Sequence, residues 1–467
     1  MTPPSAAPAL LRPRVAQDLP DRLARSAAVT GRGSHLRTDE VADWLAGRAR
    51  AHHFRVERVP LDHLDGWSFR PGTGDLRHRS GKFFSVVGLS ADVGEGPIPS
   101  WSQPIIHQPE VGILGILAKE FDGVLHFLMQ AKMEPGNCNL LQISPTVQAT
   151  RSNYQRVHQG SGVTYLEYFT DRDRARVLSD SLQSEHGSWF YRKANRNILV
   201  ETDGEVPDHP DFCWLTLGQI GELLRQDDIV NMDARTVISC FPMTGPGEAR
   251  ALRSDTELLS WFTAERSRHD VSVRLIPLSE VDGWEHDAQG LGRPDGRYFR
   301  VAGVAVEAGS REVTGWSQPL FEPCGTGIAA FLYRVVEGVP HLLVHAKVEA
   351  GFLDTVELAP TVQATPENWQ HMAAQERPPF LDTVLSARDR GAVRYEAVQS
   401  EEGGRFLNAR IRYMFVEADE QTAALDPGPG YQWATPEQLN SLSAHGHYLN
   451  VQARTLLACI NTGAARL

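Results

Sequence analysis

PTVQAT occupies residues 145–150, and the same six letters return at residues 360–365, an offset of 215 (360 minus 145). Two further pairs share that offset: WSQP at 101–104 and 316–319, and AKMEPG at 131–136 beside AKVEAG at 346–351. A repeat of this length exceeds a solenoid unit and has the size of a domain. The hexapeptide therefore predicts a duplicated domain.

The match extends outward from these anchors with small loop insertions. It joins DGW at 65–67 to DGW at 282–284, QSEHG at 183–187 to QSEEG at 399–403, and NMDARTVISC at 231–240 to NVQARTLLAC at 450–459. FPMTGPGEARA, residues 241–251, is typical of a linker because Pro and Gly interrupt regular structure. We expect a mobile tail at 1–20, where Pro and Ala show no periodic apolar face, and domains at 21–243 and 251–467.

Composition is that of a soluble globular protein, with 41% hydrophobic and 22% charged residues. The 46 basic and 58 acidic residues give a net charge of -12, which disfavours binding to nucleic acid. No secretory apolar region is present, nor a run of roughly 18 apolar residues, so we expect a cytoplasmic protein without a membrane segment. The five cysteines form no C-x-x-C pair, and Cys240 and Cys459 are expected in the core.

Strands and helices alternate within each repeat. The apolar runs 111–121 and 124–132 flank Asp122-Gly123, a hairpin signal, and the second repeat has the same arrangement around Glu337-Gly338. Ser/Thr-x-x-Gln boxes at Thr216 and Thr435 predict helix starts, and another helix is expected near SNYQRVHQG, residues 152–160. We therefore predict a duplicated α+β domain with mixed sheets flanked by helices.

Several common catalytic motifs are absent. The chain has no phosphate-binding P-loop, no H-E-x-x-H, no G-x-S-x-G and no EF-hand loop. GTGIAA at 325–330 matches G-x-G-x-x-A but is expected to open a strand, which excludes a Rossmann site. Neither repeat contains the glutamate cluster of a Nudix box, so no metal site is predicted.

The polar residues shared by the two repeats form two matching sets. The first repeat contains Lys132, Glu134, Thr146 and Gln148, and the second contains Lys347, Glu349, Thr361 and Gln363. Two accounts remain open: a turn whose Thr and Gln satisfy backbone groups, or a pocket for a nucleotide or sugar. WSQP adds Trp101, Ser102, Gln103, Trp316 and Gln318 to the pocket account, although a tryptophan is also an ordinary core residue.

The repeats also differ. The first is the more polar near the hexapeptide, with Asn137, Asn139, Gln142, Ser144 and Tyr154 where the second has Phe352, Asp354, Glu357, Ala359 and Trp369. SEHGSWFYRKANRN adds Tyr191, Lys193 and Arg196, whereas the second repeat retains Arg412 but has Asn408 or Ala409 near the position of Lys193. A solvated face of alternating charge would also account for these cations.

In WSQP, AKxEPGN and SPTVQATxSNY, all repeated in a second half, the chain resembles the nucleotide-diphosphate-hexose 2,3-dehydratase family. The resemblance covers nearly the whole chain after the tail, and Ala350 departs from the family pattern, where proline is expected. It implies two tandem domains related to the Nudix hydrolase fold, without a working Nudix box. It also implies a dTDP-linked 4-keto-6-deoxyglucose substrate, no cofactor, and a downstream 3-ketoreductase as partner, because a free 3,4-diketo sugar is unstable.

The implied chemistry is removal of the C3 proton beside the C4 ketone, followed by loss of the C2 hydroxyl. We hypothesise that Lys193 or Tyr191 donates to the C4 oxygen and that Glu185 or His186 handles the proton. Arg196 or Lys132 is expected to hold the diphosphate, and the first pocket is expected to turn substrate over while the second binds it passively. The substrate-binding set is predicted as Trp101, Ser102, Gln103, Lys132, Glu134, Asn137, Thr146, Gln148, Arg151, Asn153, Tyr154, Arg196, Trp316, Gln318, Lys347, Glu349, Thr361, Gln363 and Arg412.

Two other functions remain open from the sequence. One is a magnesium-dependent hydrolase that cleaves nucleotide sugars at the diphosphate, and the other is a sensor that binds them unchanged. A homodimer is expected as the commonest assembly.

Overall fold

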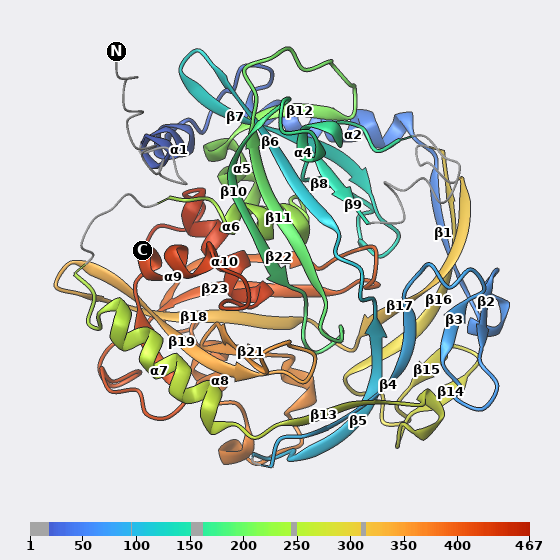
Figure 1. Cartoon of the computed structure of the whole chain (residues 1–467). Helices are drawn as coiled ribbons and strands as arrows, with labels where there is room; N and C mark the ends of the chain where they lie inside the picture. Colours follow the sequence, from blue (N-terminus) through green and yellow to red (C-terminus); the bar gives the residue numbers. More distant parts are fainter. Residues whose placement is uncertain (1–17, 95, 151–161, 244–249, 310–313) are drawn as a thin grey trace, which may run out of the picture.

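The computed structural model describes residues 18–94, 96–150, 162–243, 250–309 and 314–467 (Figure 1). Within this part of the chain, helices and strands form two similar halves with four sheets, two of seven strands and two of five. The mixed α+β character expected from the sequence is confirmed. The expected helix at 152–160 and the linker residues 244–249 lie outside the described residues.

The two seven-stranded sheets have the same topology. The first contains β10 (Arg176–Ser184), β11 (Ala194–Glu201), β6 (Ile113–Phe121), β7 (Val124–Met133) and β12 (Phe212–Thr216) in that order, with β8 (Leu141–Ser144) on β7 and β9 (Val147–Ala149) on β6. The second contains β22 (Val393–Ser400), β23 (Arg410–Glu417), β18 (Gly327–Val336), β19 (Val339–Val348) and β24 (Tyr431–Ala434), with β20 (Val356–Ala359) on β19 and β21 (Val362–Ala364) on β18. Only β6 with β11, and β18 with β23, run parallel within these sheets, as far as the structure describes the chain.

The central hairpins turn where the sequence predicts. Asp122 and Gly123 have φ of 50° and 78°, and Glu337 and Gly338 have φ of 50° and 80°. Both positions of a type I′ turn need positive φ, which explains the glycine in the second position. The apolar runs on either side are therefore antiparallel partners, and GTGIAA enters strand β18, as expected.

The hexapeptide PTVQAT connects β8 to β9 and includes β9; β8 pairs with β7 and β9 pairs with β6 beyond the point where β6 and β7 stop pairing with each other. The buried Thr146 hydroxyl accepts from Leu117 N at 2.8 Å and donates to Leu128 O, so it links the two strands. Thr361 makes the same pair of bonds in the second half, to Leu332 N and Leu343 O. Each threonine thus satisfies one backbone N–H and one backbone C=O of the two central strands.

The five-stranded sheets exchange strands between the halves. One contains β2 (Trp67–Phe69), β3 (Leu76–His78), β4 (Ser85–Asp92), β5 (Ser100–His107) and β13 (Ser272–Ile276); the other contains β14 (Glu285–Asp287), β15 (Gly290–Gly292), β16 (Phe299–Ala308), β17 (Gly315–Pro323) and β1 (Phe54–Val59). Strand β1 of the first half pairs with β16, and β13 of the second half pairs with β4 (Figure 1). The predicted units 21–243 and 251–467 thus each place one strand in a sheet of the other unit.

The helices are α1 (Leu19–Ala28), α2 (Val41–Ala51), α4 (Glu167–Thr170), α5 (Leu217–Leu224), α6 (Met232–Ser239), α7 (Asp255–Arg268), α8 (Leu381–Leu385), α9 (Pro436–Ser443) and α10 (Val451–Asn461). Short 3-10 helices lie at Thr38–Glu40, Leu61–His63, Leu278–Glu280, Pro366–Asn368 and Ala374–Glu376. Capping boxes start α5 at Thr216 and α9 at Thr435, as predicted. Helix α1 begins at Leu19, two residues before the expected start of the first domain at residue 21.

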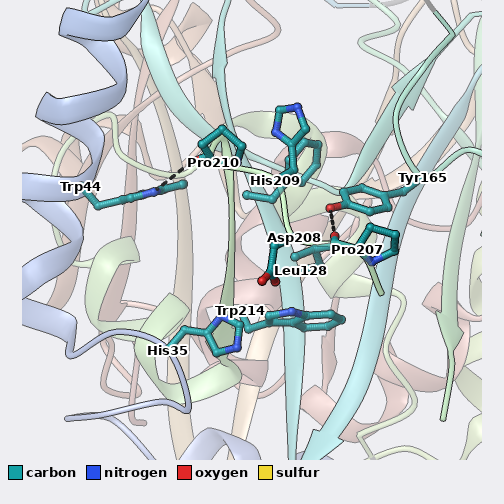
Figure 2. A pocket seen from close by; sticks show the side chains of 10 residues that line it. His35, Trp44, Leu128, Tyr165, Pro207, Asp208, His209, Pro210 and Trp214 are labelled. Carbon is teal, nitrogen blue, oxygen red and sulfur yellow. Dashed lines mark hydrogen bonds between the residues drawn. The ribbon is translucent and has the colours of Figure 1, made fainter. Parts of the chain in front are cut away.

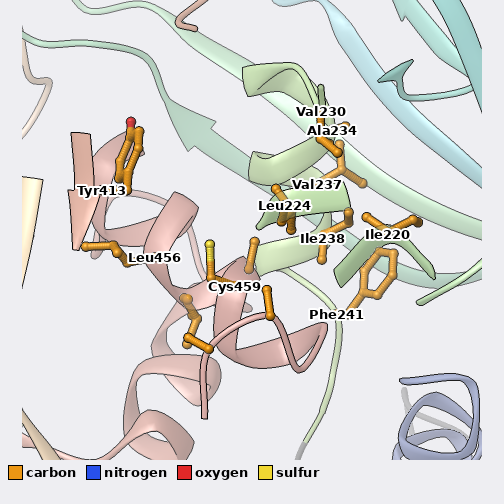
Figure 3. Close-up of a cluster of buried hydrophobic side chains, with 14 of the residues drawn as sticks. Ile220, Leu224, Val230, Ala234, Val237, Ile238, Phe241, Tyr413, Leu456 and Cys459 are labelled. Atoms are coloured by element: carbon orange, nitrogen blue, oxygen red, sulfur yellow. The ribbon is translucent and has the colours of Figure 1, made fainter. Parts of the chain in front are cut away.

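The halves share one hydrophobic core around α6 and α10, which pack against each other (Figure 3). Val237 and Ile238 of α6 and Leu456 of α10 are fully buried there. Cys240 and Cys459 are also buried in or beside this contact, as expected. Among the described residues, no helix combines the length and the apolar character needed to cross a membrane.

Candidate active site at the junction of the two halves

A loop of each half interlocks with a loop of the other half. Gly136 N donates to Gly403 O at 2.8 Å, and Asn408 N donates to Gly136 O at 2.7 Å. A Cβ at Gly136 would lie 1.7 Å from Phe406 O, so only glycine permits this approach. In the corresponding place, Gly351 N donates to Gly187 O at 2.7 Å. Each AKxExG loop therefore meets the QSExG loop of the other half.

The first junction gathers buried and half-buried polar side chains, which we call the first cluster: Lys132, Glu134, Asn137, Gln148, Glu185, Lys193, Asn195, Asp233 and Glu402. Lys132 Nζ donates to Gln148 Oε1 at 2.6 Å, and Gln148 Nε2 donates to Glu134 Oε1 at 2.9 Å. The predicted residues Lys132, Glu134 and Gln148 are thus brought together at the end of β7.

A second group of hydrogen bonds holds the predicted catalytic lysine. Lys193 Nζ donates to Asn195 Oδ1 at 2.8 Å and to Glu110 O, and Asn195 Nδ2 donates to Glu185 Oε1 at 2.7 Å. Lys193 is 6% exposed and Glu185 is 3% exposed. Two of the four residues predicted as catalytic therefore lie together in a nearly solvent-free position.

Burial and neighbouring charge shift the pKa values of this cluster in opposite directions. Burial raises the pKa of the Glu402 carboxyl to about 7; nearby Arg405 opposes the rise, while Glu185 and Glu134 add to it. Burial also raises the pKa of Asp233, with Glu402 and Glu134 adding to the shift, and lowers the pKa of the Lys193 ammonium. A carboxylic acid that holds its proton near neutral pH and a lysine with a lowered pKa suit acid–base chemistry.

Several atoms of the first cluster have no hydrogen-bond partner among the described residues. They are Glu134 Oε2, Asn137 Nδ2 and Oδ1, Glu185 Oε2 and Asp233 Oδ2. Buried polar atoms are rarely left unpaired in native proteins, so these atoms indicate where a polar ligand would bind. Within the described part of the chain, no three His, Cys, Asp or Glu side chains are arranged to hold a metal ion.

The second junction is less polar, and we call it the second cluster: Lys347, Glu349, Gln363, His186, Glu401 and Asn450. Gln363 Nε2 donates to Glu349 Oε1 at 2.8 Å, as in the first cluster. Burial raises the pKa of the Glu349 carboxyl. Comparison of the repeats places Ala409, Ile411, Gln452 and Phe352 where the first cluster has Lys193, Asn195, Asp233 and Asn137.

The WSQP motifs support the interlocked loops. Trp101 Nε1 donates to Gln103 Oε1 at 2.9 Å, and Gln103 Nε2 donates to Ser188 O at 2.7 Å. In the second half Trp316 and Gln318 repeat this arrangement, with Gln318 Nε2 donating to Gly404 O at 2.8 Å. The repeated DGW tryptophans cross between the halves: Trp284 Nε1 donates to Ser102 O, and Trp67 Nε1 donates to Ser317 O. In this structure the motif positions loops beside both clusters.

The remaining predicted residues lie elsewhere. Tyr191 and Trp101 pack against a separate apolar cluster that contains Ala350, and His186 pairs with Glu401 at 2.7 Å. Arg196 makes a bidentate ion pair with Asp180 on β10, and Arg412 pairs with Glu396 on β22. Arg151, Asn153 and Tyr154 lie outside the described residues.

Sequence reasoning missed Glu402, Asp233, Asn195 and Arg405. Arg405 Nε donates to Gln108 Oε1 at 3.0 Å, and its guanidinium lies over the Phe84 ring, 4.5 Å from the centroid. The signal available for Glu402 was QSEEG, where a second glutamate follows the one shared with QSEHG. Only the crossing of the loops between halves places that residue in the first cluster.

A separate surface cavity of about 350 Å³ lies beside β12 (Figure 2). Trp44, Tyr165 and Trp214 line it, and Tyr165 OH donates to Pro207 O, while Trp44 Nε1 donates to Pro210 O. It contains none of the residues predicted for the site.

Comparison with known proteins identifies the family. The family model for NDP-hexose 2,3-dehydratase matches residues 38–241 and 255–460. A dTDP-4-dehydro-6-deoxy-alpha-D-glucopyranose 2,3-dehydratase from Amycolatopsis orientalis is 58% identical over 461 residues, 98% of this chain and 97% of the relative. Relatives of the same name from Saccharopolyspora spinosa and Streptomyces violaceoruber are 50% and 51% identical, each over 91% of this chain and over 91% and 98% of their own length. The chain belongs to the NDP-hexose 2,3-dehydratase family.

Proposed function

We propose that the protein removes the C2 hydroxyl of dTDP-4-keto-6-deoxyglucose as water, giving a 3,4-diketo-2,6-dideoxy sugar nucleotide. The relatives that carry this activity in their names are 50–58% identical over at least 91% of the chain. The observation that carries the proposal is the first cluster, where two carboxylic acids and a lysine of lowered pKa meet beside unpaired polar atoms. Such groups match the proton transfers that the reaction requires.

The reaction needs no external oxidant or reductant, because the electrons move only between carbons of the sugar. A base takes the C3 proton, and the electron pair of that C–H bond forms an enolate with the C4 ketone. The enolate then expels the C2 hydroxyl, which leaves as water after protonation by an acid. The resulting C2–C3 enol tautomerises to a ketone at C3, so oxidation at C3 and reduction at C2 cancel.

We assign the roles from position and protonation. Lys193, held by Asn195 and Glu110 O, donates to the C4 oxygen and stabilises the enolate. Glu185 is the base for the C3 proton, and Glu402, with a pKa of about 7, supplies the proton for the leaving hydroxyl. Lys132 remains our candidate for holding the diphosphate, and Arg405 is added to it because its guanidinium influences the same cluster.

We further propose that turnover is confined to the first cluster and that the second binds nucleotide sugar without converting it. The second cluster keeps the Lys, Glu and Gln of the repeat but has Ala409 in place of the lysine donor. Without Lys193 and Asn195 it lacks the group assigned to the C4 oxygen. Calorimetric titration with dTDP should find two sites per chain, and one site would contradict passive binding by the second half.

The fold proposal is that each half is a Nudix-like domain that has lost the metal-binding glutamate cluster. The mixed seven-stranded sheet with helices beside it supports this assignment.

We also propose a homodimer, because twofold assemblies are the commonest among soluble oligomers. Light scattering coupled to size-exclusion chromatography measures the assembly, and a monomer would refute that part.

The test is to incubate the protein with dTDP-4-keto-6-deoxyglucose, EDTA, a 3-ketoreductase and NADPH, and to follow products by mass. A sugar nucleotide reduced at C3 and lacking the C2 oxygen is expected. Intact substrate that binds tightly would instead support a sensor. Release of dTMP only after magnesium is restored would support a pyrophosphohydrolase.

A further inference from the structure

The two QSEx loops each send neighbouring side chains into different clusters. Glu185 lies in the first cluster, whereas His186, the next residue, meets Glu401 of the second half. Glu401 accepts from Tyr413 OH at 2.7 Å, whereas Glu402, the next residue, is near Glu185 and Glu134 of the first cluster. The pair His186–Glu401 therefore bridges the two loops beside Glu185 and Glu402.

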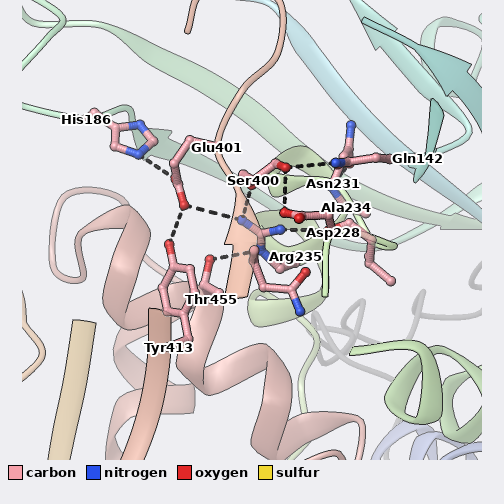
Figure 4. Close-up of polar contacts among 12 residues, drawn as sticks. Gln142, His186, Asp228, Asn231, Ala234, Arg235, Ser400, Glu401, Tyr413 and Thr455 are labelled. Atoms are coloured by element: carbon pink, nitrogen blue, oxygen red, sulfur yellow. Dashed lines mark hydrogen bonds and ion pairs between the residues drawn. The ribbon is translucent and has the colours of Figure 1, made fainter. Parts of the chain in front are cut away.

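The bridge is buried among packed and paired groups, and His186 Nδ1 has no hydrogen-bond partner among the described residues. His186 Nε2 lies 2.7 Å from Glu401 Oε2, and these residues are 2% and 1% exposed (Figure 4). The imidazole stacks on Trp189 with ring centroids 5.5 Å apart and meets Phe406 edge-on at 5.1 Å. Arg235 lies 3.6 Å from the other carboxylate oxygen of Glu401. A pair so confined allows little independent movement of the two loops.

Both loops are also anchored just before the bridge by an arginine of the opposite half. Arg235 of α6 donates to Ser400 O at 2.8 Å, and Arg454 of α10 donates to Ser184 O. The backbone is therefore fixed at residues 184 and 400, but these bonds do not hold the loops to each other. Among the described residues, the pair His186–Glu401 is the side-chain hydrogen bond that joins residues 183–187 to residues 399–403.

We propose that His186 and Glu401 are a positioning pair, which holds Glu185 and Glu402 at the separation that the dehydration requires. This inference rests on the proposed function of the first cluster. His186 then has no proton-transfer role of its own, in contrast to the alternative that the sequence left open. Its contribution lies in the hydrogen bond between the loops, and loss of that bond should lower the rate of the chemical step rather than substrate binding.

The experiment compares two substitutions of one residue. His186→Leu keeps an apolar side chain against Trp189 and Phe406 but removes the donor to Glu401. We expect kcat to fall about tenfold to a hundredfold, with KM within about threefold of wild type, because small misplacements of catalytic groups act on kcat. His186→Gln places an amide N–H near the position of Nε2, so it should keep kcat within about threefold of wild type.

Controls separate this inference from the proposed function and from folding. His341→Leu removes another buried histidine, 1% exposed and bonded to Leu252 N, and should leave kcat unchanged in folded protein. If His186→Leu does not fold, Tyr413→Phe removes one donor to Glu401 with little change in shape, and a lowered kcat at constant KM is again expected.

The outcomes are distinct. A wild-type protein without dehydratase activity refutes the proposed function. An active wild type with unchanged kcat in folded His186→Leu, or with unchanged kcat in Tyr413→Phe when the leucine variant does not fold, refutes the positioning pair alone. A His186→Gln variant as inactive as His186→Leu also overturns it and assigns His186 a proton-transfer role.

Discussion

Glu402→Gln should make the protein more stable and less active, because the surroundings of Glu402 disfavour its charged form. Burial raises its pKa from an ordinary 4.5 to about 7. Between these values the unfolded chain has lost the proton and the folded chain keeps it, so stability falls as pH rises. The difference of about 2.5 pH units (7 minus 4.5) corresponds to about 3 kcal/mol of stability, lost fully above pH 7.

Glutamine resembles the protonated acid and cannot ionise, so the variant escapes this loss. Urea unfolding at pH 8 should show Glu402→Gln more stable than wild type by about 3 kcal/mol, and most of the difference should disappear at pH 5. The turnover assay at pH 7 should show a loss of about a hundredfold or more if the residue is the acid. An equal stability difference at both pH values would contradict the raised pKa of Glu402 in the folded protein.

The neighbouring carboxylate provides a control of opposite sign. Burial raises the pKa of Glu401, but the hydrogen bond from His186 and the charges of His186 and Arg235 lower it by more, so the pKa lies below its ordinary value. Its contribution to stability is present above the unfolded pKa and is lost as pH falls through the folded one. Glu401→Gln should therefore be less stable than wild type at pH 8. If Glu401→Gln were more stable than wild type at pH 8, His186 and Arg235 would not stabilise the charged form of Glu401.

Three further predictions concern the repeated motifs. Thr146→Val leaves the buried Leu117 N and Leu128 O unpaired and should cost about 2–4 kcal/mol in urea unfolding; a cost near zero would contradict the role given to the hydroxyl. Gly136→Ala places a Cβ against Phe406 O and should lower kcat by displacing the loop of Glu402, whereas wild-type kinetics would refute the close approach. Glu134→Gln removes the carboxylate that accepts from Gln148 and lies 3.7 Å from Lys132, so it should reduce turnover at least about tenfold. Glu349→Gln in the matching position should stay within about threefold of wild type, and equal losses would place catalysis in both halves.

Elements determined by local sequence were predictable. The turns at Asp122-Gly123 and Glu337-Gly338, and the helix starts at Thr216 and Thr435, depend on residues adjacent in the chain. The grouping of Lys132, Glu134 and Gln148 also follows from the repeat, because all three lie on or beside one hairpin. The hydrogen bonds among these three side chains involve residues of the first half alone, so the fold of the second half was not needed to predict them.

The strand exchange was not predictable, because tertiary packing decides which sheet a short strand joins. FRVERV of β1 and SVRLI of β13 occupy matching places, and nothing within either strand indicates that its partner belongs to the other half. Glu402 was missed for this reason. Arg196, and not its neighbour Asn195, was predicted from the sequence as a site residue. Neighbouring residues of a strand point to opposite faces of the sheet, so Arg196 pairs with Asp180 whereas Asn195 donates to Glu185 in the first cluster.

The most direct measurement is the kcat of Lys193→Ala at saturating dTDP-4-keto-6-deoxyglucose, with Lys119→Ala, whose Nζ donates to Gly204 O at the surface, as a control. We expect a loss of at least about a hundredfold for Lys193→Ala, with dTDP binding retained, because the enolate loses its donor. Lys119→Ala should match wild type. Undiminished turnover by Lys193→Ala would contradict the assignment of catalysis to the first cluster.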